Sequence, residues 1–302
     1  LTPGQKLSQI QRILVERDIG RLPVIEGERL LGIVSRTDVL RSLYDTPQPH
    51  ATAPGATLAD ALLRLPERWL ALLRRCGELA EREGLEAYAV GGFVRDLILG
   101  RAAGQEGYQP DLDIVVEGDG LAFARTLAGE MQAALTQHLQ FQTSTLTLPD
   151  GLSLDVATAR QEEYCRPAAL PVVVGSTLKE DLFRRDFSIN SMALRLTREH
   201  FGELIDFFGG RADLESSLVR VLHNHSFIDD PTRMFRAVRF EQRLHFHLEQ
   251  NTERLLRQAV LQDRFENISS SRIREELLQC LREPSPLDML RRLNKLKILR
   301  TI

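Results

Sequence analysis

The sequence predicts an α+β protein, with a sheet and helices in the middle of the chain, a helical part after them and a small α/β unit before them. A short run at 111–116 that begins with alternating polar and apolar residues, and a run at 152–156 that alternates throughout, predict strands with one buried face. An apolar run that ends in two glycines, at 88–92, predicts a strand, a turn and a helix. Apolar residues at helical spacing after residue 229 predict a further helix.

The first 45 residues are predicted to form a separate unit. Apolar residues recur at helical spacing from Leu7 to Leu14, and the runs 22–25 and 30–34 indicate two strands joined by a Glu-Gly-Glu turn. A helix is expected from residue 37 to about 43. Residues 46–66 are predicted to be a linker, because prolines are frequent there and its first part has no apolar run.

The segment Tyr-Ala-Val-Gly-Gly-Phe-Val-Arg-Asp, residues 88–96, is a candidate phosphate site. Gly91 and Gly92 carry no Cβ, so a triphosphate could approach backbone N–H groups beside the start of a helix. Arg95, in the first turn of that helix, could add a charge-assisted contact. A tight connection between a strand and a helix would explain the same glycines.

Asp111 and Asp113 are candidate metal ligands. Residues two apart on a strand project from one face, so the two carboxylates would lie side by side while Leu112 points into the core. Mg²⁺ is usually held by one or two carboxylates together with substrate phosphates, which suits two-metal phosphoryl transfer. Asp155, in the strand at 152–156, is a candidate third carboxylate that would complete the metal site or act as a base. A solvated strand end is the simpler alternative.

Residues 180–190 combine two arginines, carboxylates and an amide. The guanidinium of Arg185 could bind phosphate oxygens as a fork. Asp186 and Asn190 could accept from and donate to ribose hydroxyls, which would favour ribonucleotides. The alternative is an internal ion-pair network that stabilises the start of a helix.

Residues 229–240 are predicted to open a helix with an acidic cap and an early proline. Arg233, Arg236 and Arg239 fall every third residue and form one stripe, which in most proteins is only solvated surface. Asp230 and Arg233 could recognise the edge of a base, because a carboxylate accepts from an exocyclic amine and a guanidinium donates to ring acceptors. Adenine and cytosine carry that amine, whereas guanine and uracil carry a carbonyl there.

In order and spacing, these motifs resemble the class II tRNA nucleotidyltransferases, the CCA-adding group of the polymerase-β-like superfamily, which also includes bacterial poly(A) polymerases. The resemblance covers roughly residues 68 to 300. It implies a polymerase-β-like head with a small mixed sheet at 67–200 and an all-helical neck at 201–302 that binds nucleotide and RNA, with Mg²⁺ as the cofactor. The metal pair of the family matches Asp111 and Asp113.

The remaining matches assign further roles by resemblance. The phosphate turn matches Gly92 and Arg95, and the ribose and phosphate motif matches Arg185 and Asp186. The amino-acid template that selects ATP or CTP matches Asp230 and Arg233, followed by two further nucleotide-binding arginines. The candidate site residues are therefore Gly91, Gly92, Arg95, Asp111, Asp113, Asp155, Arg185, Asp186, Asn190, Asp230, Arg233, Arg236 and Arg239.

Three features refine the comparison with the family. Residues 158–171 resemble the flexible loop of enzymes that add the terminal A, which disfavours CC-only addition and leaves A addition and full CCA addition open. The family usually has Glu-Asp where this chain has Asp229-Asp230. Residues 269–276 resemble the last family motif, a helix start with a mostly structural role. Because related enzymes continue into body and tail domains, a chain that stops at Ile302 is either a fragment or grips RNA less.

Residues 1–45 resemble one CBS motif. Paired CBS motifs form a cleft for adenine nucleotides, and Ser35 and Asp38 match the position that touches ribose. With one copy present, the second half of a cleft would come from upstream sequence or from a second chain in a homodimer. Nucleotide sensing and a scaffold or dimerisation role both remain open.

Composition favours a cytoplasmic RNA-binding enzyme without a membrane partner. The chain has no stretch of 18 apolar residues and no signal peptide, and its three cysteines have no zinc spacing. The net charge is −3, but residues 91–251 carry 16 basic and 23 acidic side chains, against 11 and 7 in residues 252–302. The acidic middle suits metal ions and the basic end suits RNA. The histidines at 223, 225, 245 and 247 are expected to be surface or capping residues.

The motifs and the resemblance predict a template-independent tRNA nucleotidyltransferase. It would add the 3′-terminal A, or CCA, to the tRNA 3′ end from ATP, and from CTP in the second case, by two-metal phosphoryl transfer. One alternative is a poly(A) polymerase that acts on varied RNA ends. Another is a non-catalytic RNA-binding protein that senses adenine nucleotides.

Overall fold

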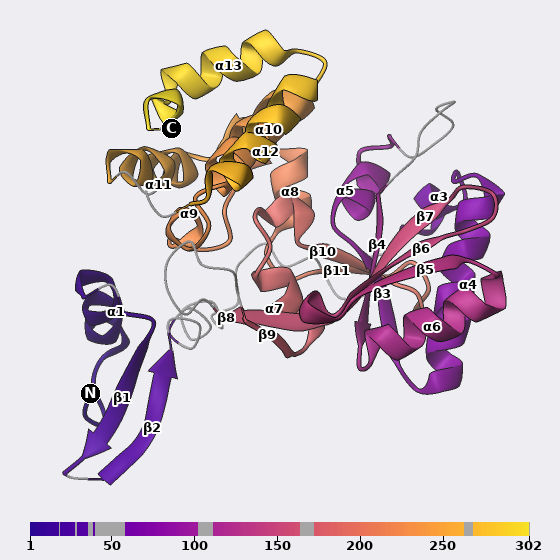
Figure 1. Cartoon of the computed structure of the whole chain (residues 1–302), viewed down its shortest axis with the longest axis horizontal. Helices are drawn as coiled ribbons and strands as arrows, with labels where there is room; N and C mark the ends of the chain where they lie inside the picture. The colour runs from indigo at the N-terminus through magenta and orange to yellow at the C-terminus, as the bar shows by residue number, and fades with distance from the viewer. Residues whose placement is uncertain are drawn as a thin grey trace.

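The computed structural model describes residues 1–17, 19–27, 29–35, 39, 58–101, 111–163, 172–262 and 268–301. Figure 1 shows a small N-terminal unit in indigo, a sheet flanked by helices, and a group of helices in orange to yellow that ends at the C-terminus. We call the sheet with its flanking helices the head, and the part from residue 210 onward the helical region. This arrangement confirms the predicted α+β class.

The N-terminal unit consists of α1 (Leu7–Glu16) and an antiparallel pair of strands, β1 (Arg21–Glu26) and β2 (Arg29–Ser35). Leu14, Leu22 and Val39 are buried together in its core. The helix and both strands agree with the prediction. The helix expected after residue 37 lies outside the described residues apart from Val39. The contact of Ser35 and Asp38 with an adenine nucleotide stays a prediction, since Asp38 also lies outside them.

Among the described residues, a mixed sheet of seven strands in the order β11-β10-β3-β4-β7-β6-β5 forms the centre of the head. Its strands are β3 (Glu86–Val90), β4 (Leu112–Glu117), β5 (Ala134–His138), β6 (Thr143–Thr147), β7 (Ser153–Thr158), β10 (Met192–Arg195) and β11 (Leu204–Asp206). Neighbours are antiparallel except β4 and β7, which run parallel. The connection between this parallel pair contains α6 (Gly120–Met131) and the β5–β6 hairpin.

The two faces of the sheet have different neighbours. Leu112 and Ile114 of β4 are buried in the main core, to which α4 (Glu67–Glu83) and α6 contribute. Asp113 and Val115 alternate with them and therefore project from the other face. Val115 is buried there with residues of α7 (Leu178–Phe183). The metal-ligand candidate Asp113 thus lies on the face that the alternating pattern predicted.

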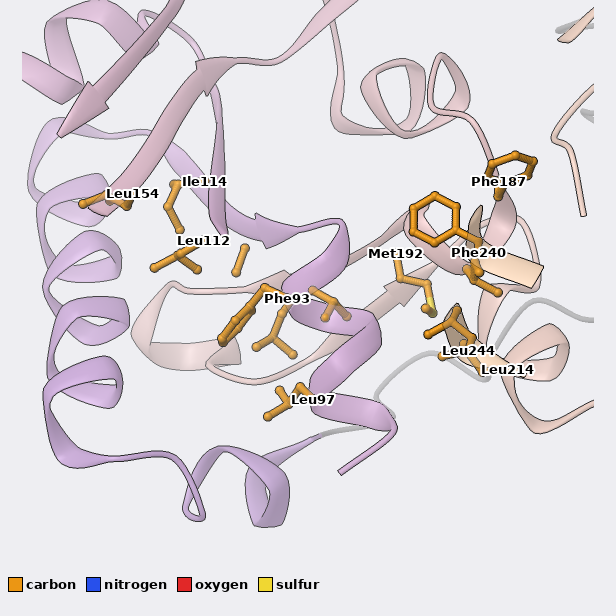
Figure 2. Close-up of a cluster of buried hydrophobic side chains, with 14 of the residues drawn as sticks. Phe93, Leu97, Leu112, Ile114, Leu154, Phe187, Met192, Leu214, Phe240 and Leu244 are labelled. Carbon is orange, nitrogen blue, oxygen red and sulfur yellow. The ribbon is translucent and has the colours of Figure 1, made fainter. Parts of the chain in front are cut away.

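The main core continues from the head into the helical region. Figure 2 shows Leu112, Ile114 and Leu154 of the sheet near α5 (Gly92–Ile98), and a second group of buried side chains around Phe187 and Phe240. The rings of Phe187 and Phe240 meet edge to face, with centroids 5.7 Å apart. Phe240 belongs to α10 (Arg233–Leu244), so this contact packs the helical region against the head.

The helical region carries one short strand pair as well as helices. Its helices are α8 (Gly210–Glu215), α9 (Ser226–Asp229), α10, α11 (Gln250–Leu261), α12 (Ser270–Arg282) and α13 (Pro286–Lys295). Two residues of β12 (Leu218–Val219) pair in parallel with two of β13 (His247–Leu248), so the predicted neck is mainly, not entirely, helical. Arg292 of α13 donates to Glu241 of α10 at 2.6 and 2.8 Å, which ties the last helix to the region.

Two predicted domain boundaries were wrong in position. The boundary after residue 200 divides the sheet, because β11 pairs with β10. The predicted linker also extends too far. Leu62 at the end of α3 (Ala59–Leu62) and Leu65 are buried in the main core, so the head includes residues before 67.

Cys76 and Cys280 are buried free thiols, and Cys165 lies outside the described residues. Burial raises the pKa of the Cys76 thiol to about 12 and that of Cys280 to about 11. No helix in the described ranges is both long and apolar enough to cross a membrane.

Helix α4 approaches the sheet closely because residue 77 is glycine. A Cβ at Gly77 would overlap the carbonyl oxygen of Leu196. The backbone N–H of Leu196 donates to the carbonyl oxygen of Ala87 in β3, so Leu196 is held against the sheet. Gly77→Ala should therefore lower the free energy of unfolding by roughly 1–3 kcal/mol, even though alanine favours helices. The midpoint of urea unfolding measures this.

The matched control is Gly129→Ala. Gly129 is also helical, and a Cβ there would meet no atom within 4 Å. This variant should gain up to about 1 kcal/mol from helix propensity. Equal stability of the two variants would contradict the close approach of α4.

Candidate active site

All thirteen candidate residues line one cleft of about 780 Å³ between the head and α10. They come from the β3–α5 turn, from β4 and β7, from the segment after α7, and from the start and body of α10. Residues spread over some 150 positions of sequence thus meet in one place. The fold brings every predicted residue to the cleft, while their individual roles stay predictions.

Strand register aligns the carboxylates. In the parallel β4–β7 pair, Asp113 is directly opposite Asp155. Asp111, one residue before β4, lines the same cleft. Thr145 lies opposite Asp155 on β6 and donates its hydroxyl to Oδ1 of Asp155 at 2.6 Å, which fixes the orientation of that carboxylate.

The surroundings of Asp113 favour a bound cation. Burial raises the pKa of Asp113 to about 6; Arg185 opposes this, and the neighbouring carboxylates of Asp155 and Asp111 raise it further. Positive charge between the carboxylates would relieve their repulsion. In the part of the chain that is described, no three His, Cys, Asp or Glu side chains form a complete metal cage. Mg²⁺ is usually held by one or two carboxylates together with substrate phosphates, and Asp111, Asp113 and Asp155 offer carboxylate oxygens in this cleft.

The glycine turn brings a cation and an anion together. Gly91 has a φ of 73°, a conformation that favours glycine. A Cβ at this position would lie 3.0 Å from Nη1 of Arg185 and 3.2 Å from Oδ2 of Asp113. Gly91 therefore leaves room for both side chains beside the start of α5.

Asp181 holds the two arginines that follow α7. It is fully buried and accepts from Arg184 at 2.7 and 3.0 Å and from Arg185 at 3.1 and 3.4 Å. Burial alone would raise the pKa of Asp181, but the two guanidinium groups outweigh it and lower the pKa. The ion-pair network considered for this segment therefore exists, and it orients Arg185 into the cleft.

A second network crosses the cleft from α5 to α10. Arg95 donates to both oxygens of Asp96 at 2.8 and 3.0 Å and to Oδ1 of Asn190 at 2.8 Å. The amide of Asn190 donates to Oδ1 of Asp186 at 3.0 Å. Oδ2 of Asp186 accepts from Nε and Nη2 of Arg236 at 2.8 and 2.5 Å. All three nitrogens of the Arg95 guanidinium thus have protein partners.

The charge of Asp186 is strongly stabilised. Burial by itself would raise the pKa of Asp186, but Arg236 and the amide of Asn190 lower it to about 2. The charge of Asp186 likewise stabilises the charged form of Arg236 and is the main cause that raises the pKa of Arg236. This pair stays charged at neutral pH.

Asp230 and Arg233 stand at the opening of α10. Helix α10 begins at Arg233 after the cap Thr232, so the helix starts about two residues later than predicted and Asp230 belongs to the turn before it. Oδ1 of Asp230 accepts from the N–H and hydroxyl of Thr232 at 3.1 and 2.6 Å and from Arg272 at 3.0 Å. Among the described residues, no donor contacts its Oδ2.

Arg233 is held on the other side of that turn. Its guanidinium donates to Oγ of Ser226 at 2.8 Å and to the carbonyl oxygen of Arg184 at 2.7 Å. It is buried, with 6% of its surface exposed, although it lines the cleft. The predicted stripe is therefore not a solvated surface at this residue.

Sequence reasoning missed several side chains that orient the predicted ones. They are Asp96, Thr145, Asp181, Arg184, Arg272 and Glu276. Asp181 precedes Arg184 and Arg185 by three and four residues, a spacing that is consistent with the ion-pair network considered as the alternative for this segment. Thr145 and Arg272 act across strands and helices, and no local pattern indicates them.

The histidines were only partly as expected. His223 and His225 are buried, and His225 occupies the N-cap position of α9. Burial lowers the pKa of His223 well below its usual value, and nearby Arg233 lowers it further. His245 adopts a left-handed conformation at the end of α10, which confirms a capping role.

The loop predicted at 158–171 is described only at its edges. Strands β8 (Arg160–Glu163) and β9 (Val172–Gly175) pair antiparallel, and residues 164–171 lie outside the described residues. Its role in adding the terminal A stays a prediction.

Family models match the chain in three places: a poly A polymerase head domain at residues 87–220, a probable RNA- and SrmB-binding site of polymerase A at 245–302, and a CBS domain at 1–45. An A-adding tRNA nucleotidyltransferase of Geobacter sulfurreducens is 42% identical over 99% of this chain and 35% of its own length. That of Halalkalibacterium halodurans is 41% identical over 76% of this chain and 53% of its own length.

Solved structures of similar sequence have the same fold as this chain. A CCA-adding enzyme in an apo form has a TM-score of 0.77 at 43% identity, covering 83% of this chain and 58% of that one. A Thermotoga maritima CCA-adding enzyme complexed with tRNA has a TM-score of 0.72 at 41% identity, covering 83% and 56%. The chain spans between about a third and about half of the curated relatives described above. By its head, its RNA-binding segment and these relatives, the chain belongs to the tRNA nucleotidyltransferase and poly(A) polymerase family.

Proposed function

We propose that the protein adds the 3′-terminal A, or CCA, to tRNA without a nucleic-acid template, using ATP and, for CCA, CTP. One observation carries this proposal: Asp113 and Asp155 on adjacent strands, and Asp111 just before the first of them, share a cleft with the arginines and with Asp230. The two curated relatives described above are named A-adding and the two solved structures CCA-adding, so the proposal includes both forms of the reaction.

Asp111 and Asp113 are the proposed Mg²⁺ ligands. When bound, Mg²⁺ would neutralise triphosphate charge and lower the pKa of the attacking RNA 3′-hydroxyl. Asp155, oriented by Thr145, would complete the acidic set and help to accept the proton. The enzyme otherwise contributes position and charge, as is general for phosphoryl transfer.

The basic side of the cleft suits the nucleotide. Nη1 of Arg185 lies at the Gly91 turn beside Asp113, where a phosphate held by the metal would also lie. At the other end, the uncontacted Oδ2 of Asp230 is an acceptor for the exocyclic amine of adenine or cytosine. Arg233, fixed by Ser226 and Arg184, would donate to the ring of the same base.

The RNA partner is proposed to contact the end of the chain. Residues 252–302 are net basic, and the RNA-binding model matches residues 245–302. A positively charged surface attracts the phosphate backbone without regard to sequence. The cleft chemistry would equally serve a poly(A) polymerase, so product length is the measurement that separates the two activities.

Incubating the protein with tRNA ending before CCA, at C and at CC tests the reaction directly. With ATP alone, an A-adding enzyme should extend only the CC form, by one residue. With ATP and CTP together, a CCA-adding enzyme should complete all three forms. Long A tails on any of them would indicate a poly(A) polymerase, and failure to incorporate labelled ATP with Mg²⁺ would refute the proposed activity.

Asp111→Asn should remove metal affinity and lower kcat at least about 1,000-fold, because several kcal/mol of charge stabilisation are lost in the transition state. Single-turnover incorporation of ATP measures this, and the unfolding midpoint checks that the fold is intact. Asp60→Asn, at an exposed carboxylate of α3 outside the cleft, is the control and should keep normal activity. Near-normal turnover of Asp111→Asn would disprove its role as a ligand.

Asp230→Asn should weaken the preference for ATP over GTP by about tenfold or more. An amide can donate to the carbonyl of guanine, which a carboxylate cannot, and a base-edge contact contributes roughly 1–3 kcal/mol of discrimination. The ratio of kcat/KM for the two nucleotides measures this. An unchanged ratio would show that Asp230 does not read the base.

A further inference from the structure

Helix α12 lies behind the residues proposed to read the base. Arg272 and Glu276 are four residues apart and therefore lie on one face of this helix. Neither is among the residues that line the cleft, yet both contact residues that do. Arg272 donates to Asp230 at 3.0 Å, and the carboxylate of Glu276 lies 3.9 Å from both Arg236 and Arg239.

The charges on this face of α12 complement those of the cleft wall. A cation faces Asp230 and an anion faces the two arginines. These side chains are mostly removed from solvent, with exposed fractions of 33% for Arg272, 17% for Glu276 and 18% for Asp230. Charged contacts with limited access to water are stronger than surface pairs. The charges of Arg272 and Glu276 on α12 are therefore opposite to those of the cleft residues that they face.

Within the described part of the chain, the hydrogen bonds that the Asp230 side chain accepts all reach one oxygen, Oδ1. Thr232 reaches Oδ1 from within the same turn, two residues away. Arg272 reaches the same Oδ1 from a separate helix, 42 residues further along the chain. The local contacts set the carboxylate relative to its own turn, and the contact with Arg272 sets it relative to the rest of the cleft.

We propose that Arg272 is a positioning residue for nucleotide selection: it holds Oδ1 of Asp230 so that Oδ2 alone is presented to the base. This rests on the proposed function. A carboxylate fixed in this way offers a single acceptor in one direction, which an exocyclic amine satisfies and a carbonyl oxygen does not. Without Arg272 the carboxylate could turn about its terminal torsion, which has a broad minimum, and a bridging water could then serve guanine or uracil.

The test compares three variants of the full chain, Arg272→Gln, Arg272→Lys and Arg274→Gln, by their kcat/KM for ATP and for GTP on tRNA ending in CC. Arg272→Gln should lower the ATP-to-GTP ratio about tenfold, the size expected for one hydrogen bond to a charged group. Arg272→Lys keeps the charge without the fork and should recover part of the ratio. Arg274 is an exposed neighbour on α12, and its variant should leave the ratio unchanged.

The ratio separates positioning from a merely structural role. A variant that only loses folded protein loses both values of kcat/KM by the same factor, so its ratio does not change. An unchanged ratio in Arg272→Gln would therefore overturn the inference, whatever happens to total activity. Adding Arg272→Gln to Asp230→Asn should not lower the ratio further, because both changes act on one contact.

The outcomes also distinguish this inference from the function on which it depends. If the unaltered protein incorporates no nucleotide, both fail. If Asp230→Asn keeps the normal ratio, base reading by Asp230 fails and the role of Arg272 fails with it. If Asp230→Asn lowers the ratio and Arg272→Gln does not, only the inference about Arg272 is wrong.

Discussion

The ion pair between Asp186 and Arg236 joins the two halves of the cleft. Asp186 follows α7 in the head and Arg236 lies on α10, and two short hydrogen bonds connect them. Burying a carboxylate is unfavourable unless its oxygens are satisfied. Here both oxygens accept hydrogen bonds: Arg236 donates to Oδ2, and the amide of Asn190 and the backbone N–H of Phe187 donate to Oδ1. The position of α10, and with it of Asp230 and Arg233, follows from this buried pair and from the packing of Phe240.

The cleft has two regions of opposite character. At one end three aspartates lie together, and burial raises the pKa of Asp113, with the charges of Asp155 and Asp111 raising it further. At the other end Arg233 is already paired with a hydroxyl and a carbonyl oxygen, and Arg236 with a carboxylate. The first end is thus arranged to gain from added positive charge. The second end is preorganised, so that little side-chain entropy remains to be lost when a ligand binds.

Local chemistry made much of the site predictable. Gly91 and the Asp111–Asp113 pair could be recognised from the sequence, because a glycine turn and strand alternation each involve only a few consecutive residues. The pairing of Asp113 with Asp155 depends on the parallel register of two strands, which local sequence does not show. The contact of Arg272 with Asp230 depends on helix packing, so only the resemblance to a family, and not periodicity, pointed to the start of α12. Strand β11 was missed because its three residues are too few to show alternation, which misplaced the boundary at residue 200.

The main core has a consequence for how the chain can be divided. Buried residues from Leu62 to Ile298 form one cluster, and Phe187 and Met192 of the head share it with Phe235 and Leu244 of α10. A head produced without α10 would present these side chains to water as a large apolar patch, the kind of surface that promotes aggregation. The buried cluster therefore joins the elements from α3 to α13, and a truncation that removed α10 would open this core.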